Sequence, residues 1–392
     1  MKRLCLTLLS FMILMVSHAQ NSLDYLLQEI ESNNTTLSAL QKQVDAQKLG
    51  NKTGIYLPNP EIEFSHLWGN PSEIGNEKSF AITQSMDFPT VYGHKSKISK
   101  MLNQNLDLVY SSERINVLLQ AKQLAINLTY YNALSKDYEN RIRIAEEIAE
   151  SYQKMYDDGT IDILERNQVV MDLLTCVNEK EKIDIERKSL SNELKALNGG
   201  IEIEFDETFI LLSPLPANFN DWYLNAELNS PVIQYLNQRI NINKQQVKLN
   251  QALTLPKISA GYADERILGE KLQGITIGVS VPLWENKNAV KKAKADVISS
   301  ESSLEDNKIQ YYNRLQSLFN RSVDLHSTAI KYRQAISSYN SVPMLRKALE
   351  AGEITLLNYL LQIEAYYDAY NSMLEVEKDY ALAEAELTAA SL

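Results

Sequence analysis

The sequence carries the same landmarks twice, and this duplication limits the possible folds more than any other feature. A Gly in a turn-like stretch occurs at Gly159, in "YDDGTIDILERN", and at Gly352, in "LEAGEITLLNYL". A Leu-Pro pair precedes a strand-like run at Pro58 and again at Pro256. Each pair is separated by about 195 residues, and chance similarity between helices would not reproduce the Leu-Pro pairs. We therefore predict two structural repeats, residues 20–198 and 221–392, joined by an equatorial linker at 199–220.

The first residues have the pattern of a secretory signal peptide. Lys2 and Arg3 precede an apolar run at 4–16, and small residues then lead to a predicted cleavage site after Ala19, so residues 1–19 are set aside. Cys5 lies near the beginning of the apolar run, which excludes a lipoprotein signal. A retained anchor is the alternative, but the run is shorter than the roughly 20 residues that a membrane span needs.

The net charge argues against one kind of partner, and the cysteine content excludes an intrachain disulfide. The whole chain carries a net charge of −11, and removal of the leader's Lys2 and Arg3 makes it more negative. A nucleic-acid-binding protein needs a basic footprint, so no nucleic acid is expected as a partner. Cys176 is the one cysteine beyond the leader, so an intrachain disulfide is excluded.

Both predicted repeats have the same order of elements. A helix comes first, two short strands follow, and a very long helix is joined through the Gly to a return helix. About 65 residues of helix would span roughly 100 Å, which is too long for an ordinary globular domain. The linker adds a short alternating strand at 201–205. The predicted ranges are helices 23–50, 91–156 and 161–197 with strands 56–68 and 79–88, then helices 222–251, 286–349 and 356–390 with strands 255–264 and 273–284.

The strands alternate between apolar residues and small or polar ones, so each has one apolar face. Their lengths suit a tilted membrane strand. A soluble hairpin packed on helices would show the same alternation. The residues that we expect to face lipid are Ile62, Phe64, Phe80, Ile82, Ile275, Ile277, Val279 and Val281.

Four strands leave two open edges, and unpaired backbone groups cannot lie in lipid because each costs several kcal/mol. Three chains with four strands each would supply twelve, an even number that can close a barrel. The membrane interpretation of the strands therefore requires an oligomer.

The two glycines are expected at the tips of helical hairpins. A helix end often needs a residue with positive φ, which Gly adopts without steric penalty. Charged neighbours keep such tips in water, and an exposed tip can dock another protein. The predicted tip residues are Asp157, Asp158, Gly159, Thr160, Ile161, Ala351, Gly352, Glu353 and Ile354.

The duplication, the Leu-Pro pairs, "VSVPLW" and the tip pattern "EAGEITLLNYLLQIEAYYDA" together resemble the TolC-type outer-membrane efflux channels over nearly the whole mature chain. The resemblance implies a mainly α fold with a small membrane β part. Tandem long helical hairpins would form a trimeric α-barrel, and four strands per chain would form a twelve-stranded transmembrane β-barrel. "GIYLPNPEIEF" followed by "TQSMDFP" looks most like the branch associated with heavy-metal efflux.

The resemblance also implies partners and a location. The homotrimer would lie in outer-membrane lipid of a Gram-negative bacterium, with its helices in the periplasm. Its tips would contact a periplasmic adaptor (membrane fusion) protein and an inner-membrane efflux pump of the proton-driven RND type. Some family members carry acidic rings past the second Gly. The corresponding residues here, Asn358 and Leu361, are not acidic. Glu364 and Asp162 are acidic residues nearby, but the sequence does not show whether their side chains face the lumen.

Catalytic and metal-binding patterns are missing from the sequence. His18, His66, His94 and His326 are scattered, and no two of them have ligand spacing. No thiol pair, phosphate-binding Gly loop or nucleophile motif occurs. We therefore expect no enzyme activity, no catalytic or metal-ligating residues and no cofactor.

The main hypothesis is a passive export duct of a tripartite efflux system, gated at the tips and powered by a partner pump. The first alternative is a secreted coiled-coil rod or filament subunit. The second alternative is the outer-membrane exit duct of a protein secretion system. A periplasmic adaptor would need several soluble β domains, for which the chain has too few strands.

Overall fold

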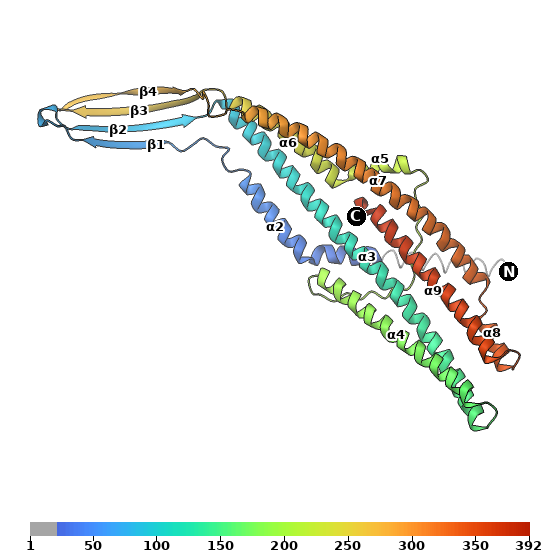
Figure 1. Ribbon diagram of the computed structural model, residues 1–392. Helices are drawn as coiled ribbons and strands as arrows, with labels where there is room; N and C mark the ends of the chain where they lie inside the picture. Colours follow the sequence, from blue (N-terminus) through green and yellow to red (C-terminus); the bar gives the residue numbers. More distant parts are fainter. Residues whose placement is uncertain (1–21) are drawn as a thin grey trace. The chain divides into compact units, whose positions relative to one another are not determined.

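The computed structural model describes residues 22–392 (Figure 1). Long helices dominate, and a single four-stranded sheet completes the chain, so the predicted fold class is confirmed. The predicted signal peptide and the cleavage site after Ala19 lie outside the described residues.

The same order of elements occurs twice. In the first half, a helix at 22–33 precedes α2 (Thr35–Gly50), β1 (Glu61–Leu67), β2 (Glu77–Met86), α3 (Pro89–Asp157) and α4 (Ile163–Leu197), with a short 3-10 helix, η1 (Ser72–Ile74), between the strands. The second half contains α5 (Phe219–Asn229), α6 (Pro231–Ala252), β3 (Lys257–Ile267), β4 (Glu270–Ser280), α7 (Ala289–Ser338), α8 (Val342–Glu350) and α9 (Leu356–Leu387), and ends in η2 (Ala389–Ser391).

The first predicted helix of each half is interrupted, and the interruption lies at the same place in both. Asn34 ends one helix and caps the next, because its Oδ1 accepts a hydrogen bond from Leu37 N at 2.9 Å. In the second half Ser230 caps α6, and Pro231 follows at the first helical turn, where its missing N–H costs nothing. The continuous helices predicted at 23–50 and 222–251 are therefore wrong in this detail.

The second long helix is also interrupted. The sequence predicts one helix at 286–349, but α7 ends at Ser338 and α8 begins at Val342. In a continuous helix the N–H of residue 343 would bond to the carbonyl of Tyr339. Residue 343 is Pro, which has no N–H and crowds that carbonyl, so the ladder stops there. α3, which has no internal Pro, stays continuous over 69 residues.

The strands form one antiparallel sheet in the order β1-β2-β3-β4. β1 begins five residues after the predicted start at 56, because Pro58 and Pro60 cannot donate to a ladder. β3 continues past its predicted end at 264, and β4 begins before its predicted start at 273 and ends at Ser280 rather than at 284. The two strands meet in a two-residue turn at Leu268 and Gly269, with φ of 53° and 89°. Two positive φ angles give a turn that matches the twist of a hairpin.

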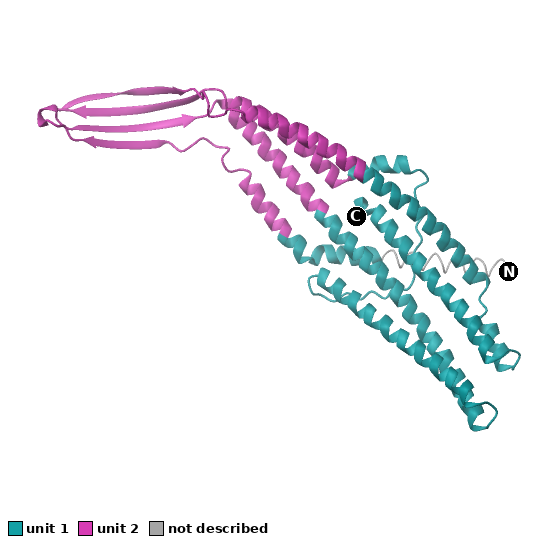
Figure 2. Cartoon of the chain, in the orientation of Figure 1, with its two compact units in different colours: residues 1–39, 113–229, 311–392 teal, residues 40–112, 230–310 magenta. Residues whose placement is uncertain are grey.

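The chain divides into two compact units (Figure 2). Unit 2, residues 40–112 and 230–310, contains the sheet and a helical core around Val91, Ile98 and Leu249. Unit 1 contains 113–229, 311–392 and the chain up to Ala39. Each unit draws residues from both predicted repeats, so the compact units do not coincide with the repeats, and the division into repeats stays a prediction.

The linker between the halves lies against the helices of unit 1. Phe205 and Ile210 are buried, in two different hydrophobic clusters. The side-chain amide of Asn132 donates to the carbonyls of Phe205 and Glu207 at 3.2 and 3.1 Å. The strand predicted at 201–205 does not form, because the described chain offers no neighbouring strand there, and Asn132 satisfies the carbonyl of Phe205 instead.

None of the helices between residues 22 and 392 is both long and apolar enough to cross a membrane.

Candidate functional site

The apolar face of the sheet gathers the side chains predicted to face lipid. Directly paired residues in antiparallel strands point to the same face. Ile62, Ile82 and Ile275 lie in one cross-strand row, and Phe64 and Phe80 pair in the next. Ile277 and Val279 continue this face along β4, and Val281 follows just past its end. All eight side chains are exposed, and Ile275 reaches 81%.

The opposite face of the sheet is polar and acidic. Small or hydroxyl side chains at Ser65, Ser79, Thr83 and Thr276 lie on it, with Leu67, Ile267 and Leu272 towards the loop end. The glutamates of the strands all lie on this face: Glu61, Glu63, Glu77, Glu265 and Glu270. The sequence reveals the alternation, but the register is needed to show that these carboxylates share one face.

The sheet has two open edges within one chain. β1 and β4 each pair with one neighbour, so their outer backbone groups have no partner strand among residues 22–392. An exposed sheet with an apolar face and free edges is unstable in water as a monomer and invites pairing with further strands. This geometry can be completed by other copies of the same sheet.

Gly159 and Gly352 end their helices with the same hydrogen-bond pattern. Their φ angles are 70° and 69°, which favour Gly. Thr160 N donates to Met155 O at 2.9 Å, and Glu353 N donates to Ala348 O at 2.8 Å, each five residues back. The sequence prediction that these glycines lie at helix C-termini is thus matched by the backbone geometry, whereas docking at these turns is untested.

The next helix of each hairpin is capped by the residue three positions after its Gly, Asp162 for α4 and Thr355 for α9. Asp162 Oδ1 accepts hydrogen bonds from Leu164 N and Glu165 N at 2.8 and 2.9 Å, and Thr355 Oγ1 accepts one from Asn358 N at 3.3 Å. Sequence reasoning missed these caps, although Asp and Thr before an apolar helix are the usual signal. Seven of the nine predicted tip residues are exposed, and only Ile161 and Ile354 are partly covered.

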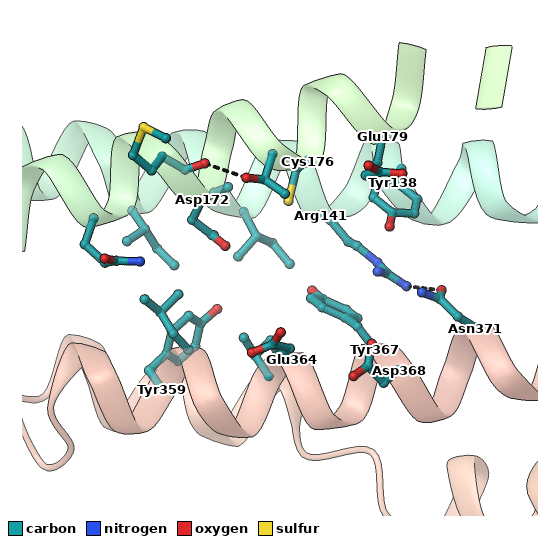
Figure 3. A pocket seen from close by; sticks show the side chains of 18 residues that line it. Tyr138, Arg141, Asp172, Cys176, Glu179, Tyr359, Glu364, Tyr367, Asp368 and Asn371 are labelled. Carbon is teal, nitrogen blue, oxygen red and sulfur yellow. Dashed lines mark hydrogen bonds between the residues drawn. The ribbon is translucent and has the colours of Figure 1, made fainter. Parts of the chain in front are cut away.

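Behind the turns, α3, α4 and α9 line a partly open cavity of about 410 Å³ within unit 1 (Figure 3). Tyr138 and Arg141 enter from α3, Asp172 and Cys176 from α4, and Glu364, Tyr367 and Asn371 from α9. Sequence reasoning did not single out this site, because nothing in a helical pattern shows which polar residues will meet across three helices.

Arg141 ties α3 to α9 across this cavity. Its side chain is only 5% exposed and pairs with Asp137 at 2.5 Å, one turn earlier on the same helix. Nη2 donates to Asn371 Oδ1 on α9 at 2.7 Å. The guanidinium lies 4.4 Å from the ring centroid of Tyr138 and 3.9 Å from that of Tyr367. A buried charge needs such a set of partners, so Arg141 acts as a cross-helix tie.

Two groups of the cavity, Asp172 and Cys176, have raised pKa values. Burial, together with the nearby Glu364 carboxylate, raises the pKa of Asp172. Burial and then Asp172 raise the pKa of Cys176 to about 11, so the thiol is protonated at neutral pH and is a poor nucleophile. The cavity therefore has the chemistry of a helix-packing site.

The histidines are dispersed over both units. His94 Nδ1 lies 2.6 Å from Gln245 Nε2, His66 packs edge-on against Trp68, and His326 packs against Tyr380. Within residues 22–392, no three His, Cys, Asp or Glu side chains come together in a way that could hold a metal ion.

Comparison with known proteins places this fold among outer-membrane channels. Over 94% of the chain, the structure matches the Campylobacter jejuni CmeC outer membrane channel, with 85% of that chain covered, a TM-score of 0.73 and 15% identity. It also matches the outer membrane protein VceC from Vibrio cholerae, with 95% of this chain and 97% of that chain covered, a TM-score of 0.76 and 14% identity. The chain thus has the fold of these outer-membrane proteins, the one that the TolC-type resemblance implies.

One curated protein is similar to this chain in sequence over part of its length. "Alkaline protease secretion protein AprF" of Pseudomonas aeruginosa is 25% identical over 185 residues. The match covers 44% of this chain and 38% of AprF, so well under half of that protein's length is spanned. No protein-family model matches the sequence.

Proposed function

We propose that this chain is the outer-membrane channel subunit of a tripartite export system. Three copies close a twelve-stranded β-barrel in the outer membrane, their helices extend into the periplasm, and the channel conducts passively without enzymatic activity. The periplasmic turns meet an adaptor protein, and an inner-membrane pump of the proton-driven RND type supplies the energy.

One observation carries this proposal. The sheet exposes its whole apolar face and leaves both edges unpaired in the described chain, on a fold shared with known outer-membrane channels. A water-soluble rod or filament would have to hide this face, and unit 2 offers it no cover. Closure with two further copies pairs both edges and turns the apolar face to lipid.

The inner wall of the proposed barrel carries charges that suggest which ions the channel prefers. Its face bears Glu61, Glu63, Glu77, Glu265 and Glu270, and rings of carboxylates favour cations in a pore. This supports export of cationic or neutral cargo. Heavy-metal cations, as the sequence resemblance suggests, fit this wall and would pass without a dedicated binding site.

The experiment that tests the proposal combines fractionation with electrical recording. The full chain should appear in outer membranes as an oligomer that dissociates on heating. Its reconstitution in a planar bilayer should produce steady, cation-preferring conductance. A soluble product after export, with no conductance in bilayers, would favour the structural rod instead.

A second candidate function, the exit duct of a protein secretion system, is supported by the AprF match. The two candidates differ in the pump with which the channel is purified. Capture of the cross-linked chain from cells should recover an efflux adaptor and pump, whereas a secretion duct would recover an adaptor together with an ATP-driven protein exporter.

A further inference from the structure

A row of basic side chains crosses the loop end of the sheet. The register pairs His66 with Lys78, Lys78 with Arg266, and Arg266 with Lys271, so one residue from each strand lies in the row. The row continues the pattern of alternate residues that includes Phe64 and the other exposed apolar side chains. The basic row therefore lies on the face predicted to meet lipid.

The two faces of the sheet carry charge of mostly opposite sign, and Lys257 is the one Lys or Arg that the four strands place on the acidic face. Asp264 is the one carboxylate that the four strands place on the apolar face, since their glutamates all lie on the other side. It pairs with Arg266 at 3.0 Å and with Lys271 at 2.7 Å. Lys78 is exposed, and no carboxylate of residues 22–392 lies within ion-pair distance of it. The three cations Lys78, Arg266 and Lys271 thus have only the Asp264 carboxylate to balance them. Like charges in directly opposite positions destabilise a sheet, and a bound anion would offset their repulsion.

The apolar face also indicates where the row would lie in a membrane. Trp68 follows His66 on the same face, is 77% exposed, and packs edge-on against the His66 ring. Exposed Trp is typical of the boundary between lipid tails and headgroups. The row and Trp68 thus mark the level of the headgroups at the loop end of the strands.

The loop end itself is built compactly. Leu268, in the β3–β4 turn, leaves no room for a Cβ on Gly75 of the β1–β2 loop, which would lie 2.4 Å from Cδ2. The two hairpins are therefore in contact at this end, away from the helices of unit 2 (Figure 1). The strand register fixes the order of the basic row across the sheet.

We propose that the row His66, Lys78, Arg266 and Lys271 binds phosphate-bearing lipid headgroups in the outer leaflet of the membrane. This inference rests on the proposed function, which puts the helices in the periplasm and the loop end outside. Ammonium and guanidinium groups form charge-assisted hydrogen bonds with phosphate oxygens, and the bound phosphate relieves the repulsion along the row. Three copies would give a basic belt around the barrel.

A pair of matched variants tests the inference. K78Q/K271Q removes two charges from the row and keeps the Asp264–Arg266 pair, so it leaves no carboxylate without a partner. The control K42Q/K188Q removes two charges elsewhere, because Lys42 is an exposed residue of α2 and Lys188 an exposed residue of α4, and it likewise leaves no carboxylate of residues 22–392 without its ion-pair partner. The probes are diphosphoryl lipid A, its dephosphorylated form and inorganic phosphate, each titrated into the detergent-solubilised full chain and read by native mass spectrometry.

We expect the wild type and the control to bind diphosphoryl lipid A equally, and K78Q/K271Q to bind it about thirtyfold more weakly. The dephosphorylated lipid should not distinguish the proteins. Equal binding of the phosphorylated lipid by K78Q/K271Q and wild type would overturn the inference, and so would inorganic phosphate that binds as tightly as the lipid. Bilayer conductance is measured in parallel. Conductance without lipid selectivity contradicts this inference alone, whereas a chain that neither inserts nor conducts contradicts the proposed function as well.

Discussion

Arg141 is a buried charge that links helices α3 and α9, so its loss should destabilise the helical part of the chain. It is buried, and its charge is balanced by Asp137 while Asn371 and two tyrosine rings complete its contacts. Removal of one partner of a buried ion pair leaves the other charge uncompensated and costs several kcal/mol.

We predict that Arg141→Ala destabilises the helical part by about 3 kcal/mol. The measurement is the midpoint of helix unfolding followed by circular dichroism. Arg143→Ala is the matched control on the same helix, because the Arg143–Glu147 pair is exposed and such pairs contribute about 0.5 kcal/mol. Equal shifts in the two variants would show that Arg141 is not a cross-helix tie.

Asp172 gives the same cavity a pH dependence. Burial, followed by Glu364, raises its pKa in the folded chain above the ordinary 3.8. The folded state therefore holds this proton more tightly than the unfolded state does. The stabilisation is fully present below pH 3.8 and is lost as the pH rises through the raised folded pKa. The other titratable or charged groups that line the cavity with it are Tyr138, Arg141, Cys176, Glu179, Tyr359, Glu364, Tyr367 and Asp368.

We predict that Asp172→Asn raises the unfolding midpoint at neutral pH, and that its advantage over wild type disappears in acid. Asp184→Asn, on the same helix, should have the opposite sign at neutral pH. Burial acts to raise the pKa of Asp184, but hydrogen bonds from Lys180 and Arg187 outweigh it and lower the pKa. If Asp172→Asn lowered the midpoint at neutral pH, the raised pKa would be wrong.

At the scale of elements, the hairpin turns depend on two glycines with positive φ. A Cβ at Gly352 would meet open space, so the cost of a side chain there is backbone strain alone. Gly352→Val should therefore destabilise the turn by about 1–2 kcal/mol and impair tip closure or adaptor docking.

The readouts for Gly352→Val are efflux in cells and cross-linking to the adaptor. Gly93→Val is the control, since Gly93 also faces open space but lies inside α3 without a positive φ. Unchanged efflux and adaptor binding in Gly352→Val would contradict the role assigned to the tips.

Adjacent residues of β4 test which face of the sheet meets lipid. Ile277 points to the apolar face, and Thr276 points to the other. We predict that Ile277→Lys weakens insertion into lipid vesicles by about 2–4 kcal/mol, whereas Thr276→Lys inserts nearly as well as wild type. Urea titration of vesicle-folded protein measures the difference. The reverse order would mean that the faces are assigned the wrong way round.

The structural features that could be predicted from the sequence are those determined by residues close together in the chain. Gly159 and Gly352, the strand alternation and the order of elements all depend on neighbours within a few residues. The interruption before Pro343 also has a local cause, but the strength of the surrounding helical pattern hid it. Arg141 and the basic row could not be predicted, because both depend on register and on packing between segments far apart in the chain.

At the scale of the whole molecule, the central claim is closure: one chain supplies four strands and needs two further copies to complete a twelve-stranded barrel. Within one chain β1 and β4 are the edges, so closure must join β4 of one protomer to β1 of the next. In a closed ring every junction between neighbouring chains is the same, and no edge is left for a fourth chain. Cross-linking at this junction can therefore join at most three chains.

Cross-linking across this junction is the most direct measurement. In a Cys176→Ser background, Phe64→Cys on β1 is combined in turn with Gln273→Cys, Ile275→Cys or Ile277→Cys on β4, all on the same face. After oxidation in outer membranes, one of these registers should give a ladder of one, two and three chains that stops at three. Monomers alone in every register, or a ladder that continues beyond three, would contradict the closed trimer.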